Sequence, residues 1–236
     1  MNLKQHNLYE TYASTQAIEC PGEEEFGALR AYFGKFLPRE KRAEILDVGC
    51  GSGNFLVWLH SLGYEGAVGV DVSEEQIERG KGLGIKNLIL GDAREFLREN
   101  QNRFDVIFAR DFLEHFTKEE TLELMTLVRE SLKYGGFFMG QTLNGESLLA
   151  GRLFYGDLTH ETAFTWRSVR QLCLAAGFSK IETYPQRPVI KGIKSFVRYC
   201  IWMGIETCLR IYLLAATGAG KGIFTQDILF KAEKKW

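Results

Sequence analysis

The chain has 236 residues, with 29 basic against 30 acidic side chains, so its formal net charge at pH 7 is −1. Apolar residues make up 45% and charged residues 25%, which is average for a globular protein and excludes a disordered chain. The balance also excludes a protein that coats nucleic acid through bulk positive charge, so we expect no nucleic-acid partner.

Strand-like and helix-like segments alternate from residue 44 onward. Apolar strands are expected at 44–48, 67–71, 87–90, 104–109 and 137–142. Helical patterns lie between them at 54–61, 74–80, 94–99 and 119–133, the last ending at Gly135-Gly136. Apolar strands that are each followed by a helix predict an α/β fold, a Rossmann-like doubly wound and mostly parallel sheet.

The remaining segments extend this core at both ends. We expect a helix at 168–176 capped by Thr165, strands at 179–184 and 226–233, and an N-terminal helix over 23–36. The connection 185–225 is too long for a simple hairpin loop. We therefore expect a single domain made of an N-terminal helical extension (1–43), a cofactor-binding core (44–184), a basic apolar helical insertion (185–225), and a last strand and tail (226–236).

The strongest motif is EILDVGCGSG over residues 44–53. A strand ends there, the glycine loop Gly49-x-Gly51-x-Gly53 follows, and a helix starts near Asn54. Such a loop lets a ligand approach the backbone, and the helix start presents free N–H groups. Asn54 breaks the G-x-G-x-x-G pattern of dinucleotide binders, and no P-loop lysine follows. Alone, the triplet could be only a tight strand–helix turn.

Two acidic residues stand at the ends of the next two strands. Asp71 ends the second strand, where a carboxylate can accept hydrogen bonds from both hydroxyls of a ribose. Asp92 follows the third strand in Gly-Asp-Ala. Three such loops at successive strand ends predict a nucleoside site.

The ordered motifs EILDVGCGSG, GVDVS, LGDA, FDVIFARDFLEHF and LKYGGFFMGQTLN resemble those of class I S-adenosylmethionine-dependent methyltransferases. The resemblance covers roughly residues 40–184 and the last strand. It implies a seven-stranded sheet with a reversed last strand, S-adenosylmethionine as cofactor and S-adenosylhomocysteine as product.

The same resemblance implies which residues hold the cofactor. The glycine loop would bind the methionine part, the second strand end the ribose, the third loop the adenine, and the fourth strand end the methionine part through its backbone. The candidates are Asp47, Gly49, Cys50, Gly51, Gly53, Asp71, Val72, Asp92, Ala93 and Arg110. The glycine loop has no obvious phosphate-binding cation, which counts against NAD. An NAD-dependent oxidoreductase and a non-catalytic methyltransferase-like module remain alternatives.

Catalytic groups are expected on the loops 110–116 and 144–166. His115 lies on the first, and Asp157 and His160 lie three residues apart on the second, where pairing would orient the imidazole and raise its basicity. Each has a structural alternative: a histidine at a helix entrance, or a capping loop before the next helix. A short N-terminal segment, 9–16, is a further candidate for folding over the cofactor.

The stretches GDLTHETAFTWRSVRQLCLAAGF and GIFTQDILFKAEK are similar to a bacterial methyltransferase subgroup associated with surface-polysaccharide biosynthesis. This similarity implies O-methylation of a saccharide hydroxyl, lipid-linked saccharides included. Other small-molecule acceptors, such as those of quinone pathways, stay open.

The five cysteines are odd in number, widely spaced and without a CxxC pair, so we expect free thiols, no metal site and a cytoplasmic protein. The first residues have no apolar run, which predicts no signal peptide. The most hydrophobic stretch, 195–219, is interrupted by three charged residues, which predicts no membrane-spanning segment.

The charge is unevenly distributed along the chain. Residues 1–185 carry 20 basic and 27 acidic side chains, whereas residues 186–236 carry 9 basic and 3 acidic ones. A broad apolar stripe runs through the basic insertion. Three interpretations are open: a helix packed on the sheet or covering the active site, a dimer interface, or peripheral contact with the inner face of a membrane through 191–215. The chain would accordingly be a monomer or a homodimer.

Overall fold

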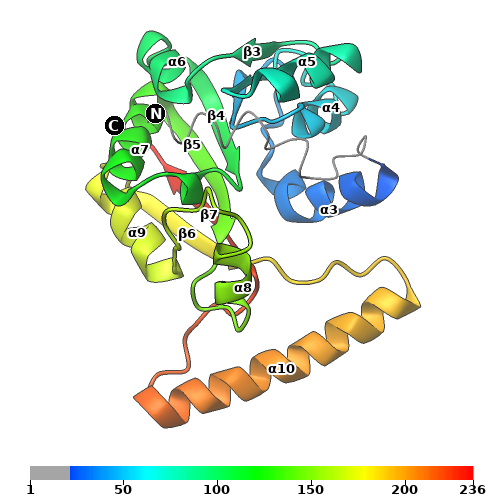
Figure 1. The fold of residues 1–236 in the computed structure, drawn as a ribbon, viewed down its shortest axis with the longest axis vertical. Coiled ribbons are helices and arrows are strands. Elements are labelled where there is room, and N and C mark those ends of the chain that lie inside the picture. Colours follow the sequence, from blue (N-terminus) through cyan, green and yellow to red (C-terminus); the bar gives the residue numbers. More distant parts are fainter. Residues whose placement is uncertain (1–21, 236) are drawn as a thin grey trace.

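The computed structural model describes residues 22–235. Seven strands form one sheet in the order β3-β2-β1-β4-β5-β7-β6 (Figure 1). Neighbours from β3 to β5 pair in parallel, and β7 pairs antiparallel with both β5 and β6. The strands are β1 (Ile45–Val48), β2 (Val68–Asp71), β3 (Leu88–Leu90), β4 (Phe104–Arg110), β5 (Leu132–Leu143), β6 (Lys180–Pro185) and β7 (Asp227–Glu233). The predicted doubly wound sheet with a reversed last strand is confirmed.

Helices cover both faces of this sheet. One face packs against α3 (Glu23–Phe33), α4 (Asn54–Ser61) and α5 (Glu74–Gly82). The other packs against α6 (Ala93–Glu99), α7 (Lys118–Ser131) and α9 (Trp166–Ala175). Short turns complete the body: η1 (Gly34–Phe36), η2 (Leu113–His115) and α8 (Ala150–Phe154). Strands buried on both sides explain their unbroken apolar runs.

Side-chain caps fix where several helices begin. Ser73 accepts a hydrogen bond from the Gln76 N–H at the start of α5, and Thr117 and Thr165 each form a capping box at α7 and α9. The predicted cap at Thr165 is therefore confirmed. These caps place the loops that precede them, and those loops lie at the carboxyl edge of the sheet.

One predicted boundary is wrong. The helical pattern extends to residue 133, but α7 ends at Ser131 and β5 begins at Leu132. Leu132 pairs with Phe104, and the Gly135 N–H donates to the Lys234 carbonyl. Main-chain pairing with both neighbours overrides the helical periodicity here, and Gly135 makes the turn with φ +82°.

The insertion holds one long helix, α10 (Ile193–Thr217), which Figure 1 shows at the edge of the molecule, outside the layers of sheet and helices. Within residues 22–235 it is the one helix long and apolar enough, by length and composition, to cross a membrane, and 6% of its most apolar window is buried. By length and composition the helix is apolar enough in spite of Glu206 and Arg210, and the prediction that no segment spans a membrane stays a prediction.

Candidate functional site

A pocket of about 350 Å³ opens at the carboxyl ends of β1, β2 and β4. It is lined from the glycine loop, the two following loops and the turn after β4. All of the predicted cofactor residues except Gly53 line it: Asp47, Gly49, Cys50, Gly51, Asp71, Val72, Asp92, Ala93 and Arg110. The sheet therefore brings together in space what the sequence spreads over more than sixty positions.

The glycine loop can exist only with glycines at its key positions. Gly49, Gly51 and Gly53 have φ values of +69°, +54° and +85°. A side chain at Gly49 would collide with the ring of Phe112, and one at Gly53 would come within 2.9 Å of Leu88. Gly53 is the N-cap of α4, so its role is to turn the chain into the helix.

Asp71 joins the end of β2 to the glycine loop. Its carboxylate accepts the Gly51 N–H and the Ser73 N–H, each at 2.8 Å. Burial raises its pKa. Each carboxylate oxygen has further lone-pair capacity, so Asp71 fits the ribose role that the resemblance implies.

Asp47 is the most unusual group in the pocket. It is 3% exposed, and within residues 22–235 its Oδ1 has no hydrogen-bond partner. Burial raises its pKa to about 7, partly offset by the Arg110 guanidinium. A buried carboxylate of this kind is costly unless a cation or donor reaches it. The amino group and sulfonium of S-adenosylmethionine supply positive charge, so the pocket fits that cofactor.

Asp92 lines the pocket while holding the third loop in shape. Its Oδ1 accepts the Arg94 N–H at 2.7 Å as the N-cap of α6, and its Oδ2 pairs with the Arg94 guanidinium at 3.1 Å. The contact with adenine implied by the resemblance stays a prediction.

His115 is the predicted catalytic residue that the structure places at the pocket. It ends η2 and lines the cavity. Its Nδ1 lies 2.8 Å from the hydroxyl of Thr159, which in turn donates to Asp157 Oδ1 at 2.7 Å. Burial lowers the pKa of His115, and the neighbouring His160 lowers it further. The imidazole is therefore held in the neutral form near pH 7.

His160 and Asp157 lie beside this group and do not line the pocket. The ring of His160 is 4.9 Å from the ring of His115, and its Nδ1 is 3.1 Å from the Phe154 carbonyl oxygen. The Asp157 carboxylate accepts both the N–H and the hydroxyl of Thr159. A catalytic role for His160, and its pairing with Asp157, remain predictions.

Two further groups position His115, and the sequence gives little indication of their roles. Thr159 links it to Asp157, although threonine alone carries no signal in a sequence. Glu114 is fully buried, accepts the Thr142 hydroxyl at 3.0 Å, and has its pKa raised by burial. Its carbonyl also accepts the N–H groups of Glu161 and Thr162, which ties the loop of His160 to η2. An acidic residue beside a histidine was the only clue in the sequence.

A Rossmann-like sheet with this glycine loop and acidic pocket defines the class of S-adenosylmethionine-dependent methyltransferases. The methyltransferase-domain family matches the chain over residues 22–183. The chain belongs to this family and takes S-adenosylmethionine as cofactor. An NAD-dependent oxidoreductase is accordingly set aside.

Several solved structures are similar over nearly the whole chain. A methyltransferase from Archaeoglobus fulgidus has a TM-score of 0.66 at 24% identity, covering 97% of this chain and 99% of its own. Phosphoethanolamine N-methyltransferase 2 of Haemonchus contortus has a TM-score of 0.64 at 18% identity, covering 97% of this chain and 61% of its own. At these identities the likeness shows the fold.

A sequence relative covers only a short stretch. The ribosomal protein L11 methyltransferase of Neisseria meningitidis is 40% identical over 67 residues, which is 28% of this chain and 22% of that protein. The chain thus matches about a fifth of the length of that relative.

Proposed function

We propose that this methyltransferase methylates a hydroxyl group of a saccharide or another small molecule, with His115 as the general base. The observation that carries the proposal is the chain of contacts from His115 through Thr159 to Asp157 at the edge of the cofactor pocket. A hydroxyl acceptor needs such a base, because its proton must leave as the new bond forms.

The contacts favour one tautomer of His115. The Thr159 hydroxyl has a single hydrogen, which it donates to the Asp157 carboxylate. Its oxygen then accepts from the imidazole, which puts the proton of His115 on Nδ1 and its basic lone pair on Nε2. The lowered pKa keeps this ring neutral near pH 7, as a base requires.

When bound in the pocket beside Asp47, the cofactor would supply a methyl group on a cationic sulfur, and that sulfur would keep the electron pair and leave as S-adenosylhomocysteine. The part of His115 is to accept the hydroxyl proton on Nε2. The part of the surrounding loop is to hold the acceptor in line, which contributes through orientation.

The acceptor side of the site is rich in aromatic and apolar surface. Tyr155 is 82% exposed and Leu158 85% exposed on the loop that carries His160. Aromatic rings pack against the apolar faces of sugar rings, which suits the saccharide acceptor implied by the resemblance. The relatives' names refer to acceptors of other kinds, phosphoethanolamine and a ribosomal protein, so an amine is the alternative to be tested.

The test compares histidine variants with a common control. We expect His115→Ala to bind S-adenosylmethionine normally by calorimetry and to lose turnover by about 100-fold. His160→Ala and Thr159→Val should lose about tenfold each. His60→Gln, a histidine outside the pocket lining, is the control and should keep its activity.

The assay measures release of S-adenosylhomocysteine over sugar nucleotides, lipid-linked saccharides and amines, with the methyl position read by NMR. A methyl group on oxygen supports the proposal. Methylation of an amine alone, or full turnover in His115→Ala, would contradict it.

A further inference from the structure

The α10 helix turns a mixed stripe, which includes two of its charged residues, toward the protein and a mostly apolar side outward. The side chains on its inner face are buried or partly buried: Ser195, Tyr199, Trp202, Met203, Glu206, Leu209, Arg210 and Leu213. This stripe holds both charged residues of the second half of the helix. A surface helix of a water-soluble protein normally keeps its charged residues on the exposed side and its large apolar residues on the inner side.

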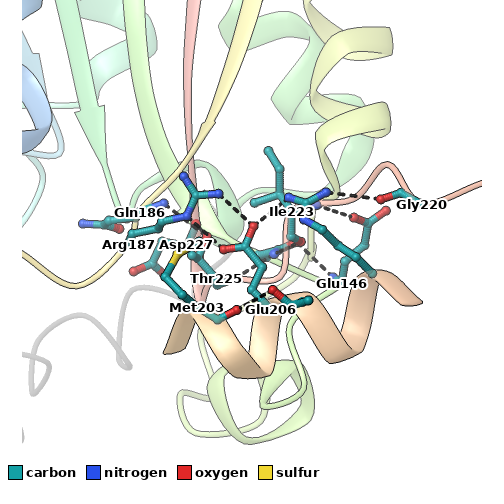
Figure 2. Close-up of polar contacts among 12 residues, drawn as sticks. Glu146, Gln186, Arg187, Met203, Glu206, Gly220, Ile223, Thr225 and Asp227 are labelled. Atoms are coloured by element: carbon teal, nitrogen blue, oxygen red, sulfur yellow. Dashed lines mark hydrogen bonds and ion pairs between the residues drawn. The ribbon is translucent and has the colours of Figure 1, made fainter. Parts of the chain in front are cut away.

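An ion-pair network holds the helix in this orientation. Glu206, 3% exposed, accepts from Arg187 at 2.8 and 2.9 Å, as Figure 2 shows. It also accepts from Arg210 at 2.6 Å, and Arg210 donates to the Gly220 carbonyl. The guanidinium of Arg187 lowers the pKa of Glu206 to about 2, with Arg210 adding to the effect. The contact fixes the middle of α10 against the body.

The outer face is a continuous apolar surface. Its large side chains are exposed by between 40% and 85%, from the first turn of the helix to the last: Ile193, Phe196, Val197, Ile201, Ile205, Ile211, Tyr212 and Leu214. A patch of this extent, in one stripe along twenty-five residues, marks an interaction surface.

A second apolar segment lies on the loop around α8. Leu148, Leu149, Tyr155 and Leu158 are all exposed. This loop is joined to the connection that follows α10, because Asn144 donates to the Ile223 carbonyl at 2.7 Å and Glu146 accepts the Ile223 N–H at 3.3 Å. The loop around α8 and the α10 helix are therefore linked through the connection that follows α10 (Figures 1 and 2).

The charges around α10 are almost all positive. Between residues 186 and 226 the sequence has one acidic residue, Glu206, and it is already paired with two arginines. Lys194 and Arg198 are exposed near the start of the helix, and Lys221 follows its end. A second copy of α10 would bring like charges together without an acidic partner. An anionic lipid surface complements them.

The network also decides between lying on a membrane and spanning it. Glu206 and Arg210 sit near the middle of α10, where a spanning helix would place them at the centre of the bilayer. Charged residues there are costly, and spanning would also break the contact with Arg187. Lying flat leaves the network at the protein side and puts the large apolar side chains of the outer face into lipid.

We propose that α10 docks flat on an anionic membrane surface. Its outer face enters the boundary between headgroups and acyl chains, and the methyltransferase body stays on the water side. The exposed loop around α8, which is tied to the end of α10 through Ile223, would lie near the same membrane surface. This inference does not depend on which group is methylated.

The first test measures sedimentation of the full chain with vesicles of phosphatidylcholine alone or with about 30% phosphatidylglycerol. We expect binding to the anionic vesicles and little to the neutral ones. Ile201→Glu/Ile211→Glu should lose binding, and Lys194→Glu/Arg198→Glu should weaken it about tenfold or more. Leu83→Glu and Lys86→Glu, exposed residues at the far end of the sheet from α10, are the matched controls and should bind like the wild type.

Cofactor binding by each variant, measured by calorimetry, shows that the body is folded. Equal binding to both vesicle types, no binding to either, or binding unchanged in the charge variants would overturn the proposal. Concentration-dependent dimers that disappear in Ile201→Glu/Ile211→Glu, without vesicle binding, would assign the face to a second copy instead.

The second test measures orientation. Spin labels are placed at Val197→Cys and Ala215→Cys, both on the outer face, in a chain whose other exposed cysteines are serines. The two sites are eighteen residues apart, about 27 Å along a helix. We expect equal, shallow depths from oxygen and nickel accessibility. Depths on opposite sides of the bilayer would overturn the flat orientation.

Discussion

Asp47 in the cofactor pocket and Glu206 beneath α10 are carboxylates of equal burial, each 3% exposed, with opposite chemistry. Burial raises the pKa of Asp47 to about 7, since its Oδ1 has no partner among the described residues. The pKa of Glu206 falls to about 2 because Arg187 and Arg210 donate to it. Burial deep in the body dominates at Asp47, whereas the hydrogen bonds from Arg187 dominate at Glu206, which lies beneath a single surface helix.

The difference separates a structural carboxylate from one prepared for a ligand. Glu206 uses its hydrogen-bonding capacity on two guanidinium groups and fixes a helix. Asp47 has an oxygen without a hydrogen-bond partner among the described residues, and such a buried carboxyl group is stable only when it is protonated or lies beside a cation. The cofactor pocket therefore contains a buried carboxyl group, Asp47, that can still bind a cation. Beneath α10 the buried carboxylate, Glu206, is already neutralised by arginines, and the outer surface of the helix is apolar.

The largest effect is expected at Asp47. Asp47→Asn keeps the size of the side chain and removes the charge that meets the cofactor, so affinity for S-adenosylmethionine should fall by about 100-fold. Calorimetry measures it. Asp105→Asn, a carboxylate outside the pocket, is the control. Unchanged affinity in Asp47→Asn would mean that the Asp47 carboxylate does not contribute to binding S-adenosylmethionine.

The pH dependence of cofactor affinity tests whether Asp47 must be ionised to bind S-adenosylmethionine. Binding of a cation favours the ionised form of Asp47, so affinity should be greatest above pH 7. Below about pH 7, where the free carboxyl is protonated, the affinity should fall with a slope that approaches tenfold per pH unit. Asp47→Asn should lack this slope. A slope that persists in the variant would assign the proton to another group.

A smaller effect is expected at Glu206. Glu206→Gln leaves Arg187 and Arg210 without their counter-charge, and since both guanidinium groups are partly exposed, the cost should be about 1–3 kcal/mol. Hydrogen exchange should rise across α10 while cofactor affinity stays unchanged. Glu78→Gln, an exposed pair, is the control. Equal exchange in both variants would contradict a fixing role.

The Glu206 contact also weakens as the pH falls, as cofactor binding at Asp47 does, but over a much more acidic interval. The folded-state pKa of Glu206 lies below its ordinary value of 4.5, so its stabilisation is complete above pH 4.5. It is lost as the pH falls from 4.5 to about 2. Exchange across α10 should therefore increase over this interval, and in Glu206→Gln it should not.

The cofactor half was predictable because its signals are local. Strand periodicity, the glycine loop and an acidic residue at a strand end each lie in a few consecutive positions, and parallel strands bring their ends together. Hence Asp47, Asp71 and Asp92 could be placed from the sequence alone. The position of His115 at the pocket follows from the same rule.

The acceptor half depends on contacts between distant positions, which periodicity does not encode. Thr159 meets His115 across forty-four residues, and Glu206 meets Arg187 from a separate loop. A helical wheel places Glu206 and Arg210 on one side of α10, but it cannot say which side faces the body. The ion pair with Arg187 decides that, and it leaves the more apolar side exposed.

The smallest effects are expected at two glycines of α10. Gly218 ends the helix with φ +74°, and Gly204 lies in the helix interior. At both positions an added methyl group would meet no other atom within 4 Å. Gly218→Ala should destabilise the end of α10 by about 1 kcal/mol, because alanine disfavours the left-handed region. Gly204→Ala should stabilise the helix by about 0.5–1 kcal/mol. Hydrogen exchange at residues 208–217 measures both. Neither substitution changes the Glu206 contact. If hydrogen exchange shifted in the same direction in both variants, the stability of this segment would depend on its packing against the body and not on the helix itself.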